Sequence, residues 1–392
     1  MDSAIDFKGK DITLRSTMGP TLTIIDAWGN PDEVTVVKFG GGETEDCLLE
    51  GFTLMGGYIG FELSDPDEPT AAGIYGAGSS ASIRNCIIAE NHDGTTISNL
   101  HGDILYCDIL YNTSLTVADR VTLYNCDGRI AYNLFEDNIT GANRGLVTEC
   151  SGLIENNIIA NNILNAGIFD YYNDAVVRYN TIYRNINTRP TFSGNVDDGG
   201  TYISNIDWNN AVSGADPGLD VTYTISNVSI PGTGNIMGDP MLADPDNGDY
   251  TLLPGSPCLD TADNVNHPSD DFVGNKRPVD MTNRQTNLLM PGNISLDYTV
   301  DLDDIIIMID NWLRTDCPCD GADIYPPGGD GVIDLMDFNV LSEYWLTDDA
   351  TFDIGAYELQ SNNLRFGLEQ QKILSNFNEF NGEVSVYYGR YT

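Results

Sequence analysis

Oxygen-bearing residues recur at regular spacing in the segment NISLDYTVDLDD, residues 293–304. They occupy positions 1, 3, 5, 7, 9 and 12 of the segment. Alternate residues of a tight loop can point toward one centre, and Ca²⁺ takes about six to eight oxygen ligands, so the spacing predicts a calcium-binding loop. Tyr298 stands at position six, where such loops usually have Gly. The predicted ligands are Asn293, Ser295, Asp297, the carbonyl of Thr299, Asp301 and Asp304.

A second copy of this pattern lies 33 residues further along the chain, where GDGVIDLMDFNVLSEYWL aligns with LDYTVDLDDIIIMIDNWL. Six residues separate the first two aspartates of DIYPPGGD, where three are usual, so this loop carries an insertion of three residues and lacks a plain position-three ligand. Each loop is predicted to lead into a short amphipathic helix. The predicted ligands of the second loop are Asp323, Asp330, the carbonyl of Val332, Asp334 and Asp337.

This duplicated arrangement of loop and helix resembles dockerin modules, which pair two calcium loops and bind cohesin domains of scaffold or surface proteins. The resemblance implies calcium as the cofactor, a cohesin-like domain as a partner, and an extracellular or cell-surface location. The first loop is expected to have the more complete ligand set. The alternative is a degenerate acidic turn that folds without metal.

The first half of the chain contains a repeat of about two dozen residues. Nine-residue segments starting at 83, 104, 130, 154 and 177 align without gaps. Position one is aliphatic, position four is Cys or Asn, position six is Ile or Phe, and position nine is Asn. Inward-facing residues at positions one and six require a corner between them, and the Asn at position four is expected to form it. Short strands joined by corners predict a stacked parallel β-helix, with the position-nine Asn side chains forming amide ladders.

The cysteines follow the same register. Cys86 and Cys107 share position four of successive units, and Cys126 and Cys150 each lie seven residues before a position-four Asn. We expect two short ladders of buried, reduced thiols, with disulfide formation or metal binding as alternatives. Cys317 and Cys319 lie between the two predicted calcium loops and are assigned no chemistry.

Several strings outside the repeat carry a second resemblance: GFTLMGGY, DPDNGDYTLLPGSPCLDTAD, GNKRPVD and FDIGAYE. With the repeat, they resemble right-handed parallel β-helix proteins, a group that includes pectate lyases, polygalacturonases and many secreted bacterial proteins. In those families the GNKRP and DIGAYE strings lie close together, whereas here the acidic segment separates them. The predicted domains are a right-handed parallel β-helix with its capping region (1–284), a dockerin-like module (285–350), and a return to the cap followed by a tail (351–392).

Charge excludes some partners. The chain has 59 acidic and 18 basic residues and a net charge of -41, which repels nucleic-acid phosphates. The longest aliphatic run, 305–309, is far shorter than the roughly 20 residues that span a bilayer, so no membrane insertion is expected. The N-terminus lacks the pattern of a signal peptide, so the predicted location depends on the resemblance.

Catalytic residues are not identified by the sequence. Charged residues at outward positions of the repeat form no clear cluster and are expected to be solvated, and His92, His101 and His267 show no pattern with a nucleophile. The predicted function is binding of a polysaccharide or a surface partner. The alternative is a polysaccharide lyase or glycoside hydrolase acting on an acidic plant or algal polysaccharide. The charged candidates are Asp108, Asp137, Glu155, Arg178 and Arg184.

Tyrosines at position three form a possible aromatic strip: Tyr106, Tyr132 and Tyr179 share that position. A strip of rings could stack on sugars, but stacking inside the coil is the expected use.

Overall fold

The computed structural model divides the chain into two compact units. The first, the β-helix body, comprises Met1–Asn275 with Asp353–Glu358, and the second comprises Lys276–Phe352 with Leu359–Thr392. The domain boundaries 1–284, 285–350 and 351–392 stay predictions. The structure describes residues 2–28, 34–59, 71–114, 121–142, 144–170, 174–194, 200–263, 267–275, 277, 306–308, 322, 324, 332–333, 336–338 and 353–357.

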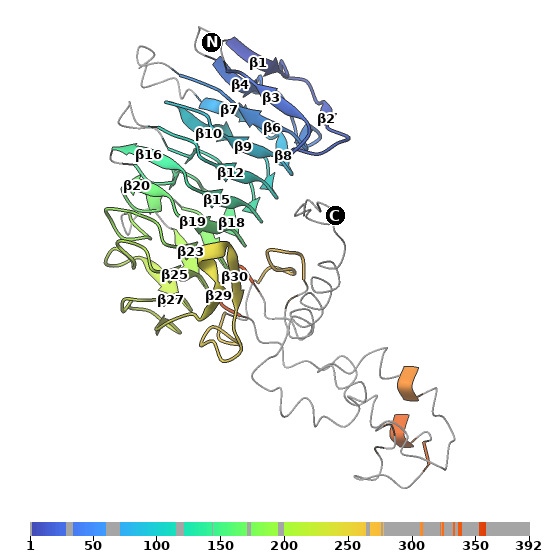
Figure 1. Ribbon diagram of the computed structural model, residues 1–392, viewed down its shortest axis with the longest axis vertical. Coiled ribbons are helices and arrows are strands. Elements are labelled where there is room, and N and C mark those ends of the chain that lie inside the picture. Colours follow the sequence, from blue (N-terminus) through green and yellow to red (C-terminus); the bar gives the residue numbers. More distant parts are fainter. Residues whose placement is uncertain are drawn as a thin grey trace, which may run out of the picture. The chain divides into compact units, whose positions relative to one another are not determined.

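Three parallel sheets form the body, and a typical coil contributes one strand to each (Figure 1). Sheet A contains β1 (Asp2–Asp6), β4 (Val34–Lys38), β7 (Ala71–Ser79), β10 (Thr95–Leu100), β13 (Leu123–Tyr124), β17 (Val147–Thr148) and β21 (Phe169–Asp170). Sheet B contains β2 (Thr13–Arg15), β5 (Leu48–Glu50), β8 (Ser82–Arg84), β11 (Ile104–Leu105), β14 (Ile130–Ala131), β18 (Leu153–Glu155), β22 (Val176–Arg178), β24 (Thr201–Ile203) and β26 (Asp220–Thr222).

Sheet C is the third wall of the coil. It contains β3 (Ile24–Asp26), β6 (Thr53–Met55), β9 (Ile87–Ala89), β12 (Asp108–Leu110), β15 (Leu134–Glu136), β19 (Ile158–Ala160), β23 (Thr181–Tyr183), β25 (Ile206–Trp208), β27 (Ile225–Ser226) and β28 (Ile236–Met237). Two short pairs complete the described strands: β16 (Ile139–Ala142) with β20 (Ile163–Asn165), and the antiparallel β29 (Leu242–Asp244) with β30 (Asp249–Leu252). This topology confirms the predicted parallel β-helix, whereas its right-handed sense stays a prediction.

The alignment of the repeats matches the register in which the strands of sheets B and C pair. Position-one residues pair in sheet B, as Ile104 does with both Ile83 and Ile130. Position-six residues pair in sheet C, as Ile109 does with Ile88 and with Phe135. All six of these side chains are buried in one continuous apolar core. A thin coil cannot bury its apolar side alone, so stacking neighbouring coils supplies the core.

The corner between sheets B and C was predicted at the wrong position. Position three, not position four, has the left-handed backbone, with φ between +49° and +59°. A second left-handed corner at position eight, directly before the position-nine Asn, was not predicted. Position four therefore points inward, which is why Asn133 and Asn157 are fully buried. The position-three residues are Asn85, Tyr106, Tyr132, Asn156 and Tyr179.

Buried Asn side chains form two ladders along the coil, and the predicted position-nine ladder is confirmed. Each Nδ2 donates to the Oδ1 of the next Asn at 2.9–3.0 Å from Asn91 to Asn210. The position-four Asn residues from Asn133 to Asn205 do the same. The carboxylate of Asp207 ends the first ladder by accepting from Asn210 Nδ2 at 2.8 Å. The ladders satisfy amides that would otherwise be buried without partners.

The cysteine columns also agree with the structure. All six cysteines in the described part of the chain are buried free thiols, and the Cys126 backbone N–H donates to Cys150 Sγ at 3.4 Å. Burial raises the pKa of Cys107 and of Cys150 well above the usual value, and the neighbouring thiol in each column raises it further. Cys107 and Cys150 are therefore small packing residues, and little of either side chain is in the reactive thiolate form.

We expect iodoacetamide at about pH 8 to leave these six cysteines unmodified in the native protein, because burial shields the thiols from the reagent and the raised pKa values of Cys107 and Cys150 further suppress the thiolate there. Peptide mapping by mass spectrometry before and after denaturation checks this, and the unfolded chain serves as the control. Rapid labelling of Cys107 or Cys150 in the folded protein would contradict the ladder arrangement.

The segment that contains the FDIGAYE string packs on the last coils of the body. Gly355 N–H donates to the Ser204 carbonyl at 3.0 Å, and Ala356 N–H donates to Thr181 Oγ1 at 3.0 Å. The buried Asp353 carboxylate accepts the backbone N–H of Asp260 at 2.9 Å. Residues 353–357 thus complete the cap although 75 residues separate them from residue 277.

Candidate functional site

Sheet B carries an unusual share of the basic residues on its outward face. Positions that flank the inward position-one column must point out of the coil, because side chains alternate along a strand. Arginines occupy these outward positions at 15, 84 and 178, and Arg129 lies immediately before β14. Four of the 18 basic residues of the chain therefore lie on this sheet, among carboxylates at the outward positions 50, 155 and 220 and at Asp103 just before β11.

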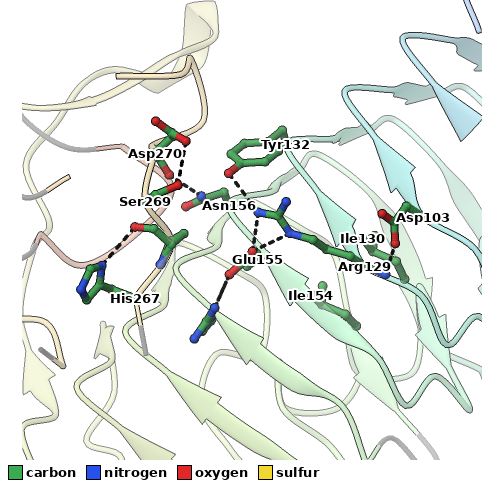
Figure 2. Close-up of polar contacts among 12 residues, drawn as sticks. Asp103, Arg129, Ile130, Tyr132, Ile154, Glu155, Asn156, His267, Ser269 and Asp270 are labelled. Atoms are coloured by element: carbon green, nitrogen blue, oxygen red, sulfur yellow. Dashed lines mark hydrogen bonds and ion pairs between the residues drawn. The ribbon is translucent and has the colours of Figure 1, made fainter. Parts of the chain in front are cut away.

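The centre of this face is a buried carboxylate held by two guanidinium groups (Figure 2). Glu155 has a side chain only 2% exposed. Arg129 donates from Nε to Glu155 Oε1 at 2.7 Å, and Arg178 donates from Nε to Oε2 at 2.8 Å. The terminal nitrogens of both arginines lie 2.6–2.7 Å from the same oxygens. Two arginines and one carboxylate leave this triplet with a net positive charge.

Tyrosine rings adjoin the triplet. Arg129 donates to the Tyr132 hydroxyl at 3.0 Å, and its guanidinium carbon lies 5.1 Å from the centre of that ring. Burial alone would lower the pKa of Arg129, but the Glu155 carboxylate and Tyr132 outweigh it and raise the pKa. Tyr132 stacks on Tyr106 with ring centres 4.7 Å apart and planes 5° from parallel. Tyr106 is 37% exposed, so the stack presents one ring to solvent.

Asp263 and Asp270, in the capping region after the last strands, cover two later members of the position-three column, Tyr179 and Asn156. Tyr179 donates from its hydroxyl to the Asp263 carbonyl at 2.6 Å. Asn156 Nδ2 donates to the Asp270 carbonyl at 2.7 Å (Figure 2). The aromatic strip therefore lies on the outside of the coil, and the expected stacking inside the coil was wrong. Tyr179 is buried by the cap, whereas Tyr106 stays partly exposed, with the charges of Asp270 and Arg84 nearby.

The charged candidates from the sequence fall into separate places. Glu155 and Arg178 form a buried pair, so the expectation that they are solvated was wrong. Arg184 pairs with Asp246 on the exposed surface, with Nη1 2.7 Å from Oδ1. Arg129 was missed. It lies on the same outward face as Glu155 in the neighbouring coil, and counting one position back from the aligned repeat would have found it.

Carboxylates gather on the outward face of sheet C. Asp108 lies on β12, while Glu136 and Asp137 lie at the end of β15 and the corner after it. Burial raises the pKa of the Glu136 carboxyl, and Asp137 and Asp108 raise it further, against the hydrogen bond that Asn161 Nδ2 donates to Oε1 at 3.0 Å. A carboxyl that holds its proton above the usual range is a candidate general acid.

The histidines lie apart from these groups. His101 Nε2 lies 3.4 Å from Asp127 Oδ2, and His267 Nδ1 contacts the Pro268 carbonyl at 3.3 Å. His92 Nδ1 and Thr113 Oγ1 are hydrogen-bonded at 2.8 Å. The described contacts of these three residues bring none of them to a serine, threonine or cysteine in an arrangement with a third, orienting group.

In the second unit, two of the predicted calcium ligands fall within the described residues. Residues 306–308 and 336–338 are helical. Asp337 is fully buried, and its Oδ1 accepts the backbone N–H of Ile324 at 2.7 Å. Val332 is partly buried just before the fully buried Ile333. The remaining predicted ligands lie outside the described residues: Asn293, Ser295, Asp297, Thr299, Asp301, Asp304, Asp323, Asp330 and Asp334.

The contact of Asp337 fits a cation loop. Ile324 follows Asp323, the predicted first ligand, so the hydrogen bond brings the closing residue of the loop to its start. A carboxylate oxygen is the donor that calcium prefers. Within the described ranges, no group of three or more His, Cys, Asp or Glu side chains could hold a metal ion.

No family model, curated protein or solved structure matches this chain. Among the helical residues that the structure describes, none belongs to a helix long and apolar enough to cross a membrane.

Proposed function

We propose that the protein is an extracellular polysaccharide-binding β-helix that binds an acidic polysaccharide on the outward face of sheet B. The observation that carries the proposal is the exposed Tyr106 ring, stacked on Tyr132 beside the Arg129 guanidinium. A tyrosine ring offers a flat apolar face, suited to the apolar face of a sugar ring. Arginine in turn matches the geometry of a carboxylate with paired N–H groups.

The preference for acidic sugars follows from the charges. Glu155 neutralises only one of the two arginines that bind it, and Glu50 neutralises Arg15 with an Nε–Oε2 distance of 2.6 Å. Arg84 is exposed and makes no ion pair with any residue that the structure describes. In a chain of net charge -41, the four arginines offset the carboxylates of Glu50, Asp103, Glu155 and Asp220 on this face, so it repels anions less than the acidic remainder of the chain does.

A polysaccharide screen separates binding from turnover. The full chain is run in native affinity gels that contain polygalacturonate, alginate or neutral glucans, and the same mixtures are assayed for new unsaturated or reducing ends. We expect retardation in at least one acidic gel without new ends. Clear turnover would reject the non-catalytic binder, and equal migration in all gels would reject polysaccharide binding.

A catalytic alternative, a lyase or glycoside hydrolase, is favoured only by the carboxylates of sheet C. Glu136 has the raised pKa of a general acid, and Asp108 in the preceding coil could act as its partner carboxylate. If the screen detects turnover, Glu136→Gln should abolish it, because glutamine cannot donate the proton. Persistence of turnover in that variant would remove the assignment.

The proposal includes a dockerin-like module that binds calcium and a cohesin-like domain of a scaffold or surface protein. Support comes from the duplicated ligand spacing and from the Asp337 hydrogen bond that joins the two ends of the second loop. Calcium would neutralise the clustered carboxylates and fix the loops against the short helices. Calcium-dependent capture of cohesin domains by the full chain tests the partner, and failure with calcium-loaded protein would reject it.

We expect two classes of calcium site in titrations of the full chain, the tighter one in the loop with regular spacing. Asp301→Asn should remove the tighter class, and Asp337→Asn should weaken the other by about tenfold or more, because each loses one charge that faces the ion. The exposed Asp174 provides the matched control, since Asp174→Asn lies in the body. Absence of calcium uptake, with thermal unfolding unchanged by chelator, would contradict the module.

A further inference from the structure

A cavity of about 310 Å³ opens near the N-terminal end of the body, between strands of sheets A and C and away from the arginines of sheet B. Its walls come from the residues after β3 and β6, the start of β4, and the corner that follows β9 (Figure 1). The volume falls at the lower end of the range of about 300–1,000 Å³ that is typical of small-molecule sites. The lining residues are Ala27, Trp28, Val34, Gly56, Tyr58, His92 and Asp93.

Two aromatic rings are exposed at this cavity. Trp28 is 54% exposed and Tyr58 is 43% exposed, which is a large apolar area to leave in water. Gly56 makes room for Trp28, because a Cβ at that position would lie 2.5 Å from Trp28 N and 2.6 Å from Trp28 Cδ1. Tyr58 is fixed by reciprocal backbone hydrogen bonds with Val34 at 2.8 and 3.0 Å. The backbone thus holds both aromatic residues at the cavity.

The His92 ring in the wall of the cavity has a buried polar atom, Nε2, without a hydrogen-bond partner in the part of the chain that the structure describes. His92 Nδ1 is engaged by Thr113 Oγ1 at 2.8 Å, which fixes the ring. Its Nε2 is buried and has no hydrogen-bond partner among the described residues. The Trp28 ring packs 4.8 Å from the His92 ring at an angle of 56°. A buried polar atom without a partner destabilises the protein, so a ligand that supplies the hydrogen bond recovers this free energy.

We infer that this cavity is a second carbohydrate site, which takes one neutral pyranose unit against Trp28 and Tyr58. Because Nε2 is buried beside the Trp28 ring, that ring shifts as the sugar enters, so that its face stays against the sugar and a hydroxyl reaches His92 Nε2. A hydroxyl can donate or accept, so it suits either tautomer of that ring. The Asp93 carboxylate lines the same cavity and accepts hydrogen bonds from hydroxyls while repelling uronates.

A methylated ammonium group is the competing ligand for an aromatic site beside a carboxylate. It offers no hydrogen bond to His92 Nε2, so it would leave that buried atom without a partner. The neutral sugar satisfies both the aromatic and the polar walls, and this difference decides between the two chemistries.

Titration of the full chain with methyl glycosides of glucose, galactose, mannose, xylose and N-acetylglucosamine tests the site, with ligand-observed NMR as the readout. We expect at least one glycoside to bind saturably with a Kd on the order of 1 mM, as suits a single small ligand. Trp28→Ala and Tyr58→Ala should each weaken binding at least about tenfold. His92→Phe keeps the ring and removes Nε2, so it should weaken binding as well. Trp208→Ala, a change on β25 outside the cavity, should leave it unchanged.

The inference does not depend on the proposed acidic site, because Arg84→Ala and Tyr106→Ala should leave binding of the neutral glycoside intact. It is overturned if no glycoside in the panel binds saturably, if Trp28→Ala binds as the wild type does, or if tetramethylammonium displaces the bound glycoside. The substituted aromatic side chains are exposed, so thermal unfolding should be unchanged and loss of binding will report on the cavity.

Discussion

The Asn162→Ala variant should lower the free energy of unfolding of the body by about 3–5 kcal/mol, one of the largest effects expected of a single polar substitution. Asn162 is fully buried in the middle of its ladder. Its Nδ2 donates to the Phe135 and Ala160 carbonyls and to Asn185 Oδ1, at 2.9–3.0 Å. Its Oδ1 accepts from the backbone and side-chain amides of Asn138 at 2.9–3.0 Å. Alanine removes all of these bonds and leaves several partners buried and unsatisfied.

Chemical denaturation followed by circular dichroism measures this loss. Asn165→Ala is the matched control, since Asn165 lies three residues further on, is exposed, and should change stability by less than about 0.5 kcal/mol. If Asn162→Ala proves as stable as the control, the amide ladder contributes nothing net and the account of the coil is wrong.

The Glu155→Gln variant should cost about 2–4 kcal/mol of stability, because it leaves Arg129 and Arg178 facing each other around a neutral group. The lower bound allows for solvent screening of Arg129, whose side chain is 36% exposed. Arg178 is only 14% exposed, so its charge is screened less. Replacing one partner of a buried ion pair is more damaging than replacing the whole pair.

Sheet B supplies its own control for this substitution. Glu50→Gln breaks the Arg15–Glu50 pair, which lies on the same outward face but has side chains 59% and 21% exposed. Exposed pairs contribute about 0–1 kcal/mol, so Glu50→Gln should be nearly neutral. Equal stability losses in the two variants would show that Glu155 is no more buried in solution than Glu50, against the geometry of the triplet.

The coil was predictable from the sequence because the same requirement for a buried residue recurs in every coil. A buried column needs an apolar or amide residue at the same place in every coil, so five aligned segments were enough to find the register of sheets B and C. The corner was assigned wrongly, since Asn is the usual left-handed residue and Tyr106, Tyr132 and Tyr179 are not expected there. Stacking of Tyr106 on Tyr132 and the hydrogen bond from Tyr179 to the cap compensate for the left-handed backbone.

The candidate site was harder to predict because its partners lie in different coils. Arg129 and Glu155 are 26 residues apart, and Asn156 meets Asp270 across 114 residues. No local pattern marks such pairs, and the outward positions of a repeat are free to vary. The cavity beside His92 likewise combines residues from several coils. Gly56 leaves room there for Trp28, a role that depends on where the Trp28 ring lies and that the sequence does not show.

The most direct test of acidic polysaccharide binding is calorimetric titration of oligogalacturonate into the full chain, compared between the wild type and the Tyr106→Ala variant. Tyr106→Ala removes the exposed ring of the stack and should weaken binding at least about tenfold, since aromatic anchors dominate such contacts. Tyr111→Ala, at an exposed corner of sheet C, should bind as the wild type does. We predict saturable binding that weakens with added salt and depends on Tyr106. Binding that is absent in the wild type, or equal in wild type and Tyr106→Ala, would contradict acidic polysaccharide binding at the tyrosine stack.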